Sequence, residues 1–93
     1  MRCLFTVSDR FTVIGRGIVL IPGLKPISEQ RFKVGDKIRL KRPDGTDVIV
    51  VIAGLELPVP NPENEVLILL REFGKEDVPV GTEVWSLDER HGF

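Results

Sequence analysis

The fold is decided by the stretch Val34-Gly-Asp-Lys-Ile-Arg-Leu-Lys-Arg-Pro-Asp-Gly-Thr-Asp-Val-Ile-Val-Val51. Over residues 37–41 cations alternate with aliphatic residues, which is the period of a strand with one wet face and one core face. The turn-forming sequence Pro-Asp-Gly-Thr follows at residues 43–46, and a β-branched run begins at Val48. We therefore predict two antiparallel strands joined by a tight hairpin turn.

The rest of the chain has the same character. Nine Gly and seven Pro in 93 residues interrupt any long helical pattern. Gly15 and Gly17 flank Arg16 where a sharp bend would need the conformational freedom of glycine. We predict strands, loops and one helical turn as follows: strands over residues 2–8, 11–15, 17–21, 37–42, 47–57, 66–71 and 83–87, exposed loops over 23–29 and 58–65, and a helical turn at 75–77.

Six or seven short strands in so short a chain predict a single all-β domain over residues 1–93. A small closed β-barrel of the Greek-key type is favoured over a two-sheet sandwich, because closure removes exposed strand edges. The polar residues 88–93 are predicted to form a flexible tail.

Composition restricts the class of protein. Apolar residues make up 42% and charged residues 29% of the chain, as in ordinary globular proteins. The longest apolar run covers residues 48–53, far short of a membrane span, and the N-terminus has no signal-peptide pattern, so no membrane contact is expected. The single cysteine, Cys3, excludes an internal disulfide, and a cytoplasmic location is predicted.

Catalytic and cofactor-binding patterns are missing from the sequence. Cys3 and His91 lie at opposite ends of the chain, whereas a nucleophile needs a base placed against it. One His and one Cys do not make a zinc site. There is no Gly-x-x-x-x-Gly-Lys-Ser/Thr phosphate loop. We therefore expect no enzyme activity, cofactor, metal or bound nucleotide.

Charge is unevenly distributed along the chain. Residues 1–55 carry ten Lys/Arg against five Asp/Glu, and residues 56–93 carry three against nine. Asymmetry of this kind is one mark of a nucleic-acid-binding protein. The most basic strand holds Lys37, Arg39 and Lys41 about 7 Å apart on one face, a spacing that suits phosphates. The alternative is a solvated outer face whose cations deter edge pairing.

Aromatic residues give less support to RNA binding, because single-strand binders interleave stacking platforms with cations. Phe5, Phe11 and Phe32 lie in apolar patterns and are predicted to be core, so no exposed aromatic is expected beside the cations. Trp85 has two interpretations, a core residue or a surface anchor in a protein contact.

Five segments in chain order resemble domain 2 of the translational GTPases. Residues 5–19, Phe-x-Val-x-Asp-x-Phe-Thr-Val-Ile-Gly-Arg-Gly-Ile-Val, are similar to the first two strands of that domain in elongation factor Tu and its relatives. Residues 32–38, Phe-x-Val-Gly-Asp-Lys-Ile, resemble the next element. Three further segments resemble the later elements of that domain: residues 52–57, Ile-Ala-Gly-Leu-Glu-Leu, residues 66–71 and residues 75–84. The resemblance implies a translation-protein barrel that stands alone, without a GTPase domain.

In elongation factor Tu this barrel helps to hold the aminoacylated end of tRNA. Matched residue by residue, the resemblance places Glu56 beside the terminal adenosine and Val19 near the same nucleotide. It places Asp9 and Phe11 at positions that line the aminoacyl pocket.

The chain also departs from the family pattern. Ser8 replaces an acidic residue, Leu67 stands where glycine is usual, and Glu65 brings negative charge toward a phosphodiester chain. A faithful tRNA pocket is therefore not expected, whereas a broader RNA or protein contact is.

Arg16 has two interpretations as well. It is either a cation for RNA or a brace for a carboxylate, with Asp9 or Glu56 as the partner. Glu56 is equally open between ligand recognition and a plain outward-facing residue.

We expect a non-catalytic binding or adaptor module that faces RNA, at the ribosome or on tRNA. The predicted RNA-binding residues are Arg16, Lys37, Arg39, Lys41 and Glu56. The alternative is a protein-interaction or structural module with no nucleic-acid partner, which would act through the loop 58–65 or a strand edge, with a homodimer as one form.

Overall fold

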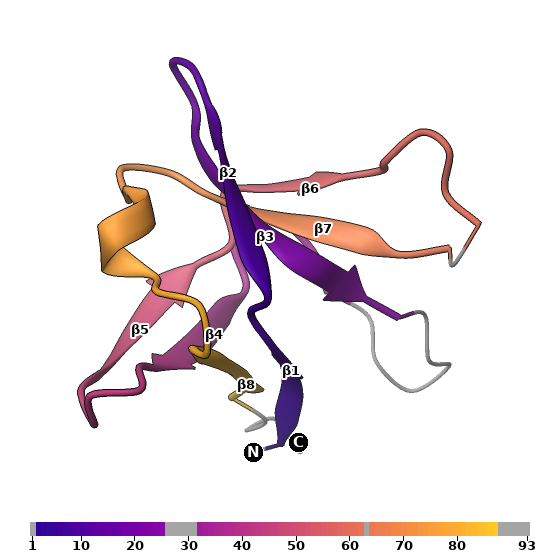
Figure 1. Ribbon diagram of the computed structural model, residues 1–93. Coiled ribbons are helices and arrows are strands. Elements are labelled where there is room, and N and C mark those ends of the chain that lie inside the picture. Colours follow the sequence, from indigo (N-terminus) through magenta and orange to yellow (C-terminus); the bar gives the residue numbers. More distant parts are fainter. Residues whose placement is uncertain (1, 26–31, 63, 88–93) are drawn as a thin grey trace.

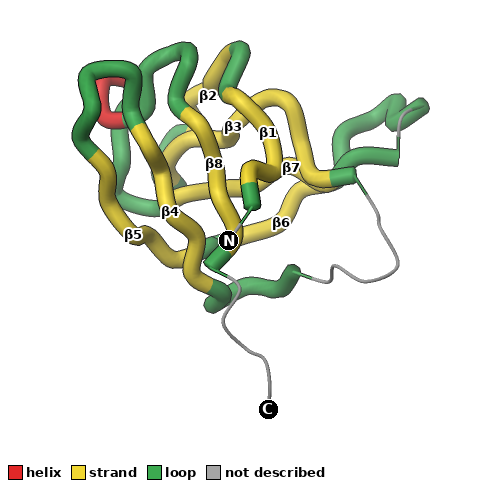
Figure 2. Tube along the Cα trace, turned by 90° about the horizontal axis from the view of Figure 1, so that it is seen from below, coloured by secondary structure: helices red, strands yellow, loops and turns green. Residues whose placement is uncertain are grey.

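The computed structural model describes residues 2–25, 32–62 and 64–87, which form two antiparallel four-stranded sheets and no α-helix (Figure 1). Sheet A has the order β1-β8-β4-β5 and sheet B the order β2-β3-β7-β6. The elements are β1 (Cys3–Thr6), β2 (Asp9–Val13), β3 (Gly17–Leu24), β4 (Lys37–Lys41), β5 (Asp47–Val51), β6 (Gly54–Glu56), β7 (Val66–Leu70), the 3-10 helix η1 (Lys75–Asp77) and β8 (Glu83–Ser86). Figure 2 shows the strands of sheet A side by side.

The β4–β5 hairpin forms as its turn residues predict. The Arg42 amide donates to the Thr46 carbonyl at 2.8 Å, and the Gly45 amide donates to the Arg42 carbonyl at 3.0 Å. Asp44 closes the turn, because its carboxylate accepts the amide of Thr46 at 3.0 Å and the hydroxyl at 2.7 Å. These bonds lower the pKa of Asp44, the backbone bond contributing most.

The bend around Arg16 also follows its prediction. Gly15 and Gly17 have φ values of +79° and +135°. Gly17 is further restricted by packing, since a Cβ at this position would lie 1.9 Å from the carbonyl oxygen of Leu70 at the end of β7. Only glycine lets β3 begin so close to the neighbouring strand.

The chain passes from sheet A to sheet B between β1 and β2. The amide of Val7 donates to the Thr82 carbonyl next to β8, at 2.8 Å, and the following amide, of Ser8, donates to the Ile21 carbonyl in β3, at 2.7 Å. Two successive residues therefore bond to different sheets.

A second crossing lies between β5 and β6. The amide of Ile52 donates to the Asp36 carbonyl beside β4, at 2.8 Å, and the amide of Ala53 donates to the Leu69 carbonyl in β7, at 2.9 Å. The prediction of one continuous strand over residues 47–57 is therefore wrong. The run is broken at 52–53 because its two halves pair with different partners.

The core lies between the two sheets. Ile38 and Leu40 of β4 have no exposed surface, which confirms the predicted alternation of that strand. Each such side chain contributes about 2 kcal/mol through burial. The buried cluster consists of Val7, Ile18, Leu20, Leu24, Ile38, Leu40, Val50, Ile52, Ile68, Leu70, Val78 and Val84. Phe5 and Phe32 are partly buried against it, as predicted.

Some boundaries differ from the prediction. β3 continues to Leu24 instead of ending at residue 21, so the first predicted loop starts later. Residues 26–31 of that loop and the predicted tail 88–93 lie outside the described residues. The helical turn at 75–77 is confirmed as η1. Within the described ranges no helix has the length and apolarity needed to cross a bilayer.

Candidate binding face

The outward side chains of sheet A form a continuous surface that we call the sheet A outer face. Strand register sets its rows: Arg39 lies between Ile49 of β5 and Trp85 of β8, and Lys41 lies between Asp47 and Glu83. The face comprises Cys3 of β1, Glu83 and Trp85 of β8, Lys37, Arg39 and Lys41 of β4, and Asp47, Ile49 and Val51 of β5.

The three predicted cations of β4 share this face. Lys37 and Lys41 are exposed and Arg39 is half-buried. In the described part of the chain none of the three side chains forms an ion pair or a hydrogen bond, and the Nε of Arg39 is buried without an acceptor. Lys37 and Arg39, which have no carboxylate opposite them on β5, remain available to an anionic ligand.

An aromatic side chain lies beside these cations, contrary to our prediction. The Nζ of Lys41 is 4.9 Å from the centroid of the Trp85 ring, a cation–π distance. The indole Nε1 donates to the Glu83 carboxylate at 2.9 Å. Within β8 the buried residues are Val84 and Ser86, so the alternation of a strand turns Trp85 to the outer face. That β8 lies next to β4 is a matter of long-range pairing, which no local pattern shows.

Charge on the face is not uniform. Acidic residues flank Lys41 on both sides, whereas the β5 residue opposite Lys37 is the apolar Val51. The positive field is therefore strongest at the Lys37–Arg39 end. On β1, in the same row as Arg39, burial and then the charge of Glu83 raise the pKa of the Cys3 thiol, which keeps it protonated at neutral pH.

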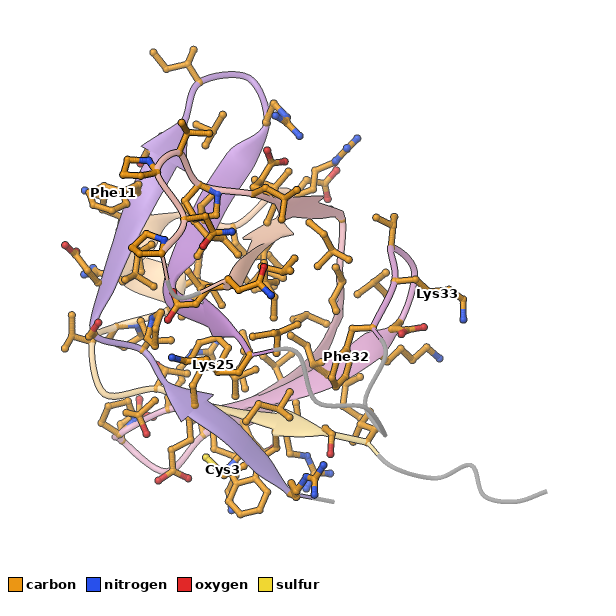
Figure 3. The ribbon with its side chains drawn as sticks, turned by 90° about the vertical axis from the view of Figure 1, so that its right-hand side faces the viewer. Cys3, Phe11, Lys25, Phe32 and Lys33 are labelled. Carbon is orange, nitrogen blue, oxygen red and sulfur yellow. The ribbon has the colours of Figure 1, made fainter. Side chains whose placement is uncertain are left out.

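The positions matched to the tRNA pocket lie on sheet B. Phe11 pairs with Val19 across β2 and β3, on the side away from the core. Phe11 is 53% exposed, so its prediction as core is wrong (Figure 3). Val19 is 6% exposed and offers little surface to a ligand. Asp9 is exposed, and its carboxylate accepts the backbone amide of Arg10 at 2.8 Å.

Arg16 is a brace, and its partner is Glu56 rather than Asp9. The Nη2 of Arg16 lies 2.7 Å from the Glu56 Oε2, with the two side chains 50% and 34% exposed. The pair joins the β2–β3 turn to β6, across a sheet in which β3 and β7 lie between them. Beside the pair, Gly54 lies close to β7, since a Cβ there would be 2.9 Å from the Leu69 side chain. The predicted RNA-binding set is thus divided between two sheets.

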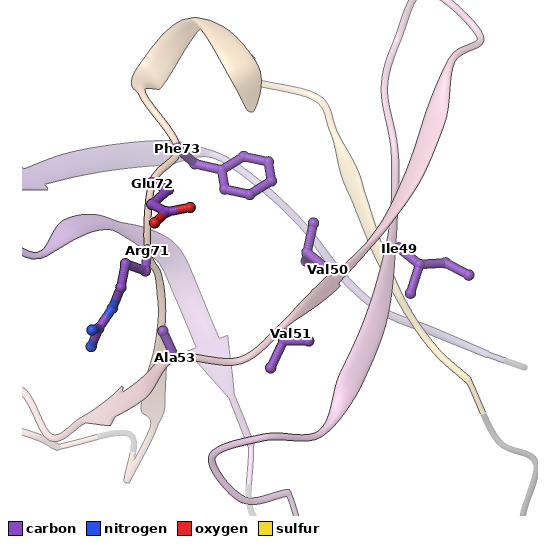
Figure 4. Close-up of a pocket in the computed structure, with 7 residues that line it drawn as sticks. All are labelled: Ile49, Val50, Val51, Ala53, Arg71, Glu72 and Phe73. Atoms are coloured by element: carbon purple, nitrogen blue, oxygen red, sulfur yellow. The ribbon is translucent and has the colours of Figure 1, made fainter.

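Two open grooves run on either side of residues 71–73. One has a volume of about 410 Å³ and lies along β5 (Figure 4). In that view Val50 and Phe73 point into the space between the strand and the segment. The other, of about 440 Å³, lies against the β2–β3 hairpin. Glu72, which lines both, has a φ of +64°, a backbone conformation that is uncommon for a residue with a side chain.

Comparisons with known proteins return no match: no family model, no curated protein and no solved structure is similar to the chain. Among the described residues no three His, Cys, Asp or Glu side chains gather closely enough to hold a metal ion. The sheet A outer face therefore remains the candidate site on its geometry alone.

Proposed function

We propose that the chain is a non-catalytic binding module that contacts RNA through the sheet A outer face. The observation that carries this proposal is the row of Lys37, Arg39 and Lys41, which lie on one strand face and have no ion pair in the described structure. Alternate residues of a strand are about 7 Å apart, so the row can follow successive phosphates of an extended strand.

Trp85 supports a single-stranded RNA. Single-strand binders combine a basic track with aromatic rings on which bases stack. Trp85 is half-buried, is adjacent to Arg39 in the register and holds Lys41 over its ring. A base that stacks on the indole would take the place of the Lys41 ammonium and release it to a phosphate.

The translation-factor likeness is part of the same proposal. The chain crosses between the sheets twice, and at each crossing successive residues form hydrogen bonds with different sheets. These crossings support a closed barrel of the kind found in domain 2 of the translational GTPases. The five resembling segments in chain order support it too. On this likeness we propose tRNA or ribosomal RNA as the partner and, with Cys3 a free thiol, the cytoplasm as the compartment.

The test is a salt titration of RNA binding by fluorescence anisotropy, with a labelled single-stranded oligonucleotide and with tRNA. Three phosphate contacts on a single strand give a log–log salt slope of about −2, which is roughly 20-fold weaker binding between 50 and 200 mM salt. Replacing Lys37, Arg39 and Lys41 with Gln should remove this slope and most of the affinity.

A matched control variant also loses three positive charges, but from positions outside the sheet A outer face. Lys33, Arg71 and Lys75 are exposed and lie off the sheet A outer face, and their replacement with Gln should leave most of the affinity intact. Equal losses in both triple variants would mean that only net charge matters. Folded protein that binds no RNA at low salt would refute the proposal.

A second candidate function is protein interaction without nucleic acid. Ile49 and Val51 are each 50% exposed on the same face, beside Arg39 and close to Trp85. Tryptophan and arginine next to apolar side chains are the composition of the centre of a protein interface. This candidate stands if RNA binding fails.

A further inference from the structure

β5 has an open edge. It pairs with β4 alone. At one end of the ladder the amide of Ile52 donates to the Asp36 carbonyl, and at the other the amide of Arg42 donates to the Thr46 carbonyl. These two bonds determine which residues of β5 form hydrogen bonds with β4. Even-numbered residues of β5 therefore bond to β4, and odd-numbered residues direct their N–H and C=O groups to the other side. No backbone hydrogen bond to another described residue reaches that side.

The usual protection of an exposed edge is missing from this strand. Edge strands are kept from pairing by Pro, Lys, bulges or covering segments. β5 has the sequence Asp-Val-Ile-Val-Val, with neither Pro nor Lys, and its register to β4 is regular. The edge of β2, by contrast, lies against η1, where the Arg10 guanidinium donates to the Lys75 carbonyl. β5 is therefore an edge on which an added strand would form a regular ladder.

Space is available at this edge. The groove of about 410 Å³ runs along Ile49, Val50 and Val51, and residues 71–73 form its far wall (Figure 4). β5 therefore borders an opening on this side instead of packing against a neighbouring strand.

The sequence of β5 complements itself in antiparallel orientation. If Ile49 lies opposite Ile49 of a second copy, each Asp47 lies opposite the other copy's Val51. All three odd-numbered residues of both strands then form hydrogen-bonded pairs, which gives six backbone bonds across the junction. A shift by two residues would lose a pair at one end, so this register is the one that uses the edge fully.

Charge favours the same register. Lys37 faces Val51 within its own sheet and has no acidic neighbour on β5. The second copy would bring its Asp47 to the far side of that Val51, about 10 Å from the Lys37 backbone, a gap that the two side chains can span. The two-fold axis repeats this pair at the other end, while the exposed Ile49 and Val51 side chains of both copies merge into one apolar patch.

We propose that the chain forms a symmetric homodimer by antiparallel pairing of β5 with β5 of a second copy, centred on Ile49. The dimer is an isologous contact in which one surface is used twice. It deepens the second candidate function by naming the partner, and it does not depend on RNA.

Cysteine cross-linking tests the register. In a Cys3→Ser background, Ile49→Cys places two thiols on the two-fold axis, where a hydrogen-bonded antiparallel pair has Cα atoms about 5.5 Å apart, within disulfide range. Val51→Cys is the matched control, since two copies of position 51 would lie about 13 Å apart. The double variant Asp47→Cys/Val51→Cys should cross-link again. Cross-links are read on non-reducing gels after mild oxidation, without RNA.

The mass in solution tests the dimer itself. Light scattering after size exclusion should give the mass of two chains for the wild type and of one chain for Ile49→Lys, which sets two lysines opposite each other. Val80→Lys, at a 54% exposed position outside β5, should remain dimeric. A wild type with the mass of one chain at millimolar concentration overturns the proposal, as does cross-linking of Val51→Cys as fast as Ile49→Cys. Neither result bears on RNA binding by the monomer.

Discussion

Replacing Gly17 with Ala is expected to cost far more stability than the same replacement at Gly15, two residues earlier in the same hairpin. Both residues have positive φ values, +79° at Gly15 and +135° at Gly17. At Gly15 a Cβ would meet no atom within 4 Å, so only the backbone conformation opposes Ala. That term is about 1–2 kcal/mol.

Gly17 adds a collision to that backbone term. Its Cβ would lie 1.9 Å from the Leu70 carbonyl oxygen and 2.9 Å from the carbonyl carbon, both in a neighbouring strand and neither able to rotate away. Relief requires β3 and β7 to separate by more than 1 Å, which breaks hydrogen bonds worth about 1 kcal/mol each and opens the core at Ile18. We expect a loss of at least about 4 kcal/mol, a large share of the roughly 5–14 kcal/mol available to a chain of this length.

Urea unfolding measures both variants, followed by far-UV circular dichroism and by the fluorescence of Trp85, which is the single tryptophan. Gly15→Ala should unfold cooperatively at a somewhat lower midpoint. Gly17→Ala should unfold at a much lower midpoint, with a free energy of unfolding at least about 4 kcal/mol below that of the wild type. If the two free energies of unfolding agree within about 1 kcal/mol, the close approach of β3 to β7 is not the constraint that the geometry indicates.

Three further predictions concern the surface. Because the Arg16–Glu56 pair is 50% and 34% exposed, a double-mutant cycle to Ala should give a coupling below about 1 kcal/mol, and a larger value would contradict this. Hydrogen bonds lower the pKa of Asp44, so its stabilisation is present above the ordinary aspartate pKa and lost as pH falls through the lower folded pKa. Asp44→Asn should therefore flatten the fall of stability below about pH 4; an unchanged fall would count against it. Burial and the charge of Glu83 raise the pKa of Cys3, so alkylation of its thiol near pH 8 should be slower than in unfolded protein. Glu83→Gln should speed this alkylation, and an unchanged rate would contradict the prediction.

The parts of the fold that follow from local sequence could be predicted. The Pro-Asp-Gly turn specifies its hairpin through hydrogen bonds among residues 42–46. The alternation over Lys37–Lys41 decides which side chains face the core. The two glycines beside Arg16 mark a bend because both have positive φ values, which other residues adopt only at a cost.

The parts that depend on which strands become neighbours could not be predicted. Residues 47–57 read as one strand, and only the pairing of its halves with β4 and β7 breaks it at 52–53. Phe11 has the same apolar surroundings in sequence as a core residue, but it faces outward because it pairs with Val19 on the far side of sheet B. The contact of Trp85 with Lys41 joins residues more than forty positions apart.

The position of β8 has a consequence for the order in which the chain can fold. β8 is the last strand in the described part of the chain, yet it lies between β1 and β4 in sheet A, so Cys3 pairs with Trp85. Sheet B uses only residues 9–70 and can assemble as soon as that part has left the ribosome. Until residues 83–86 emerge, β1 has no partner strand and β4 has only β5, so half of the core stays open. Such distant pairing makes folding slow, and the nascent chain passes through a stage in which the edges of β1 and β4 that β8 later covers are exposed to chaperones or to aggregation.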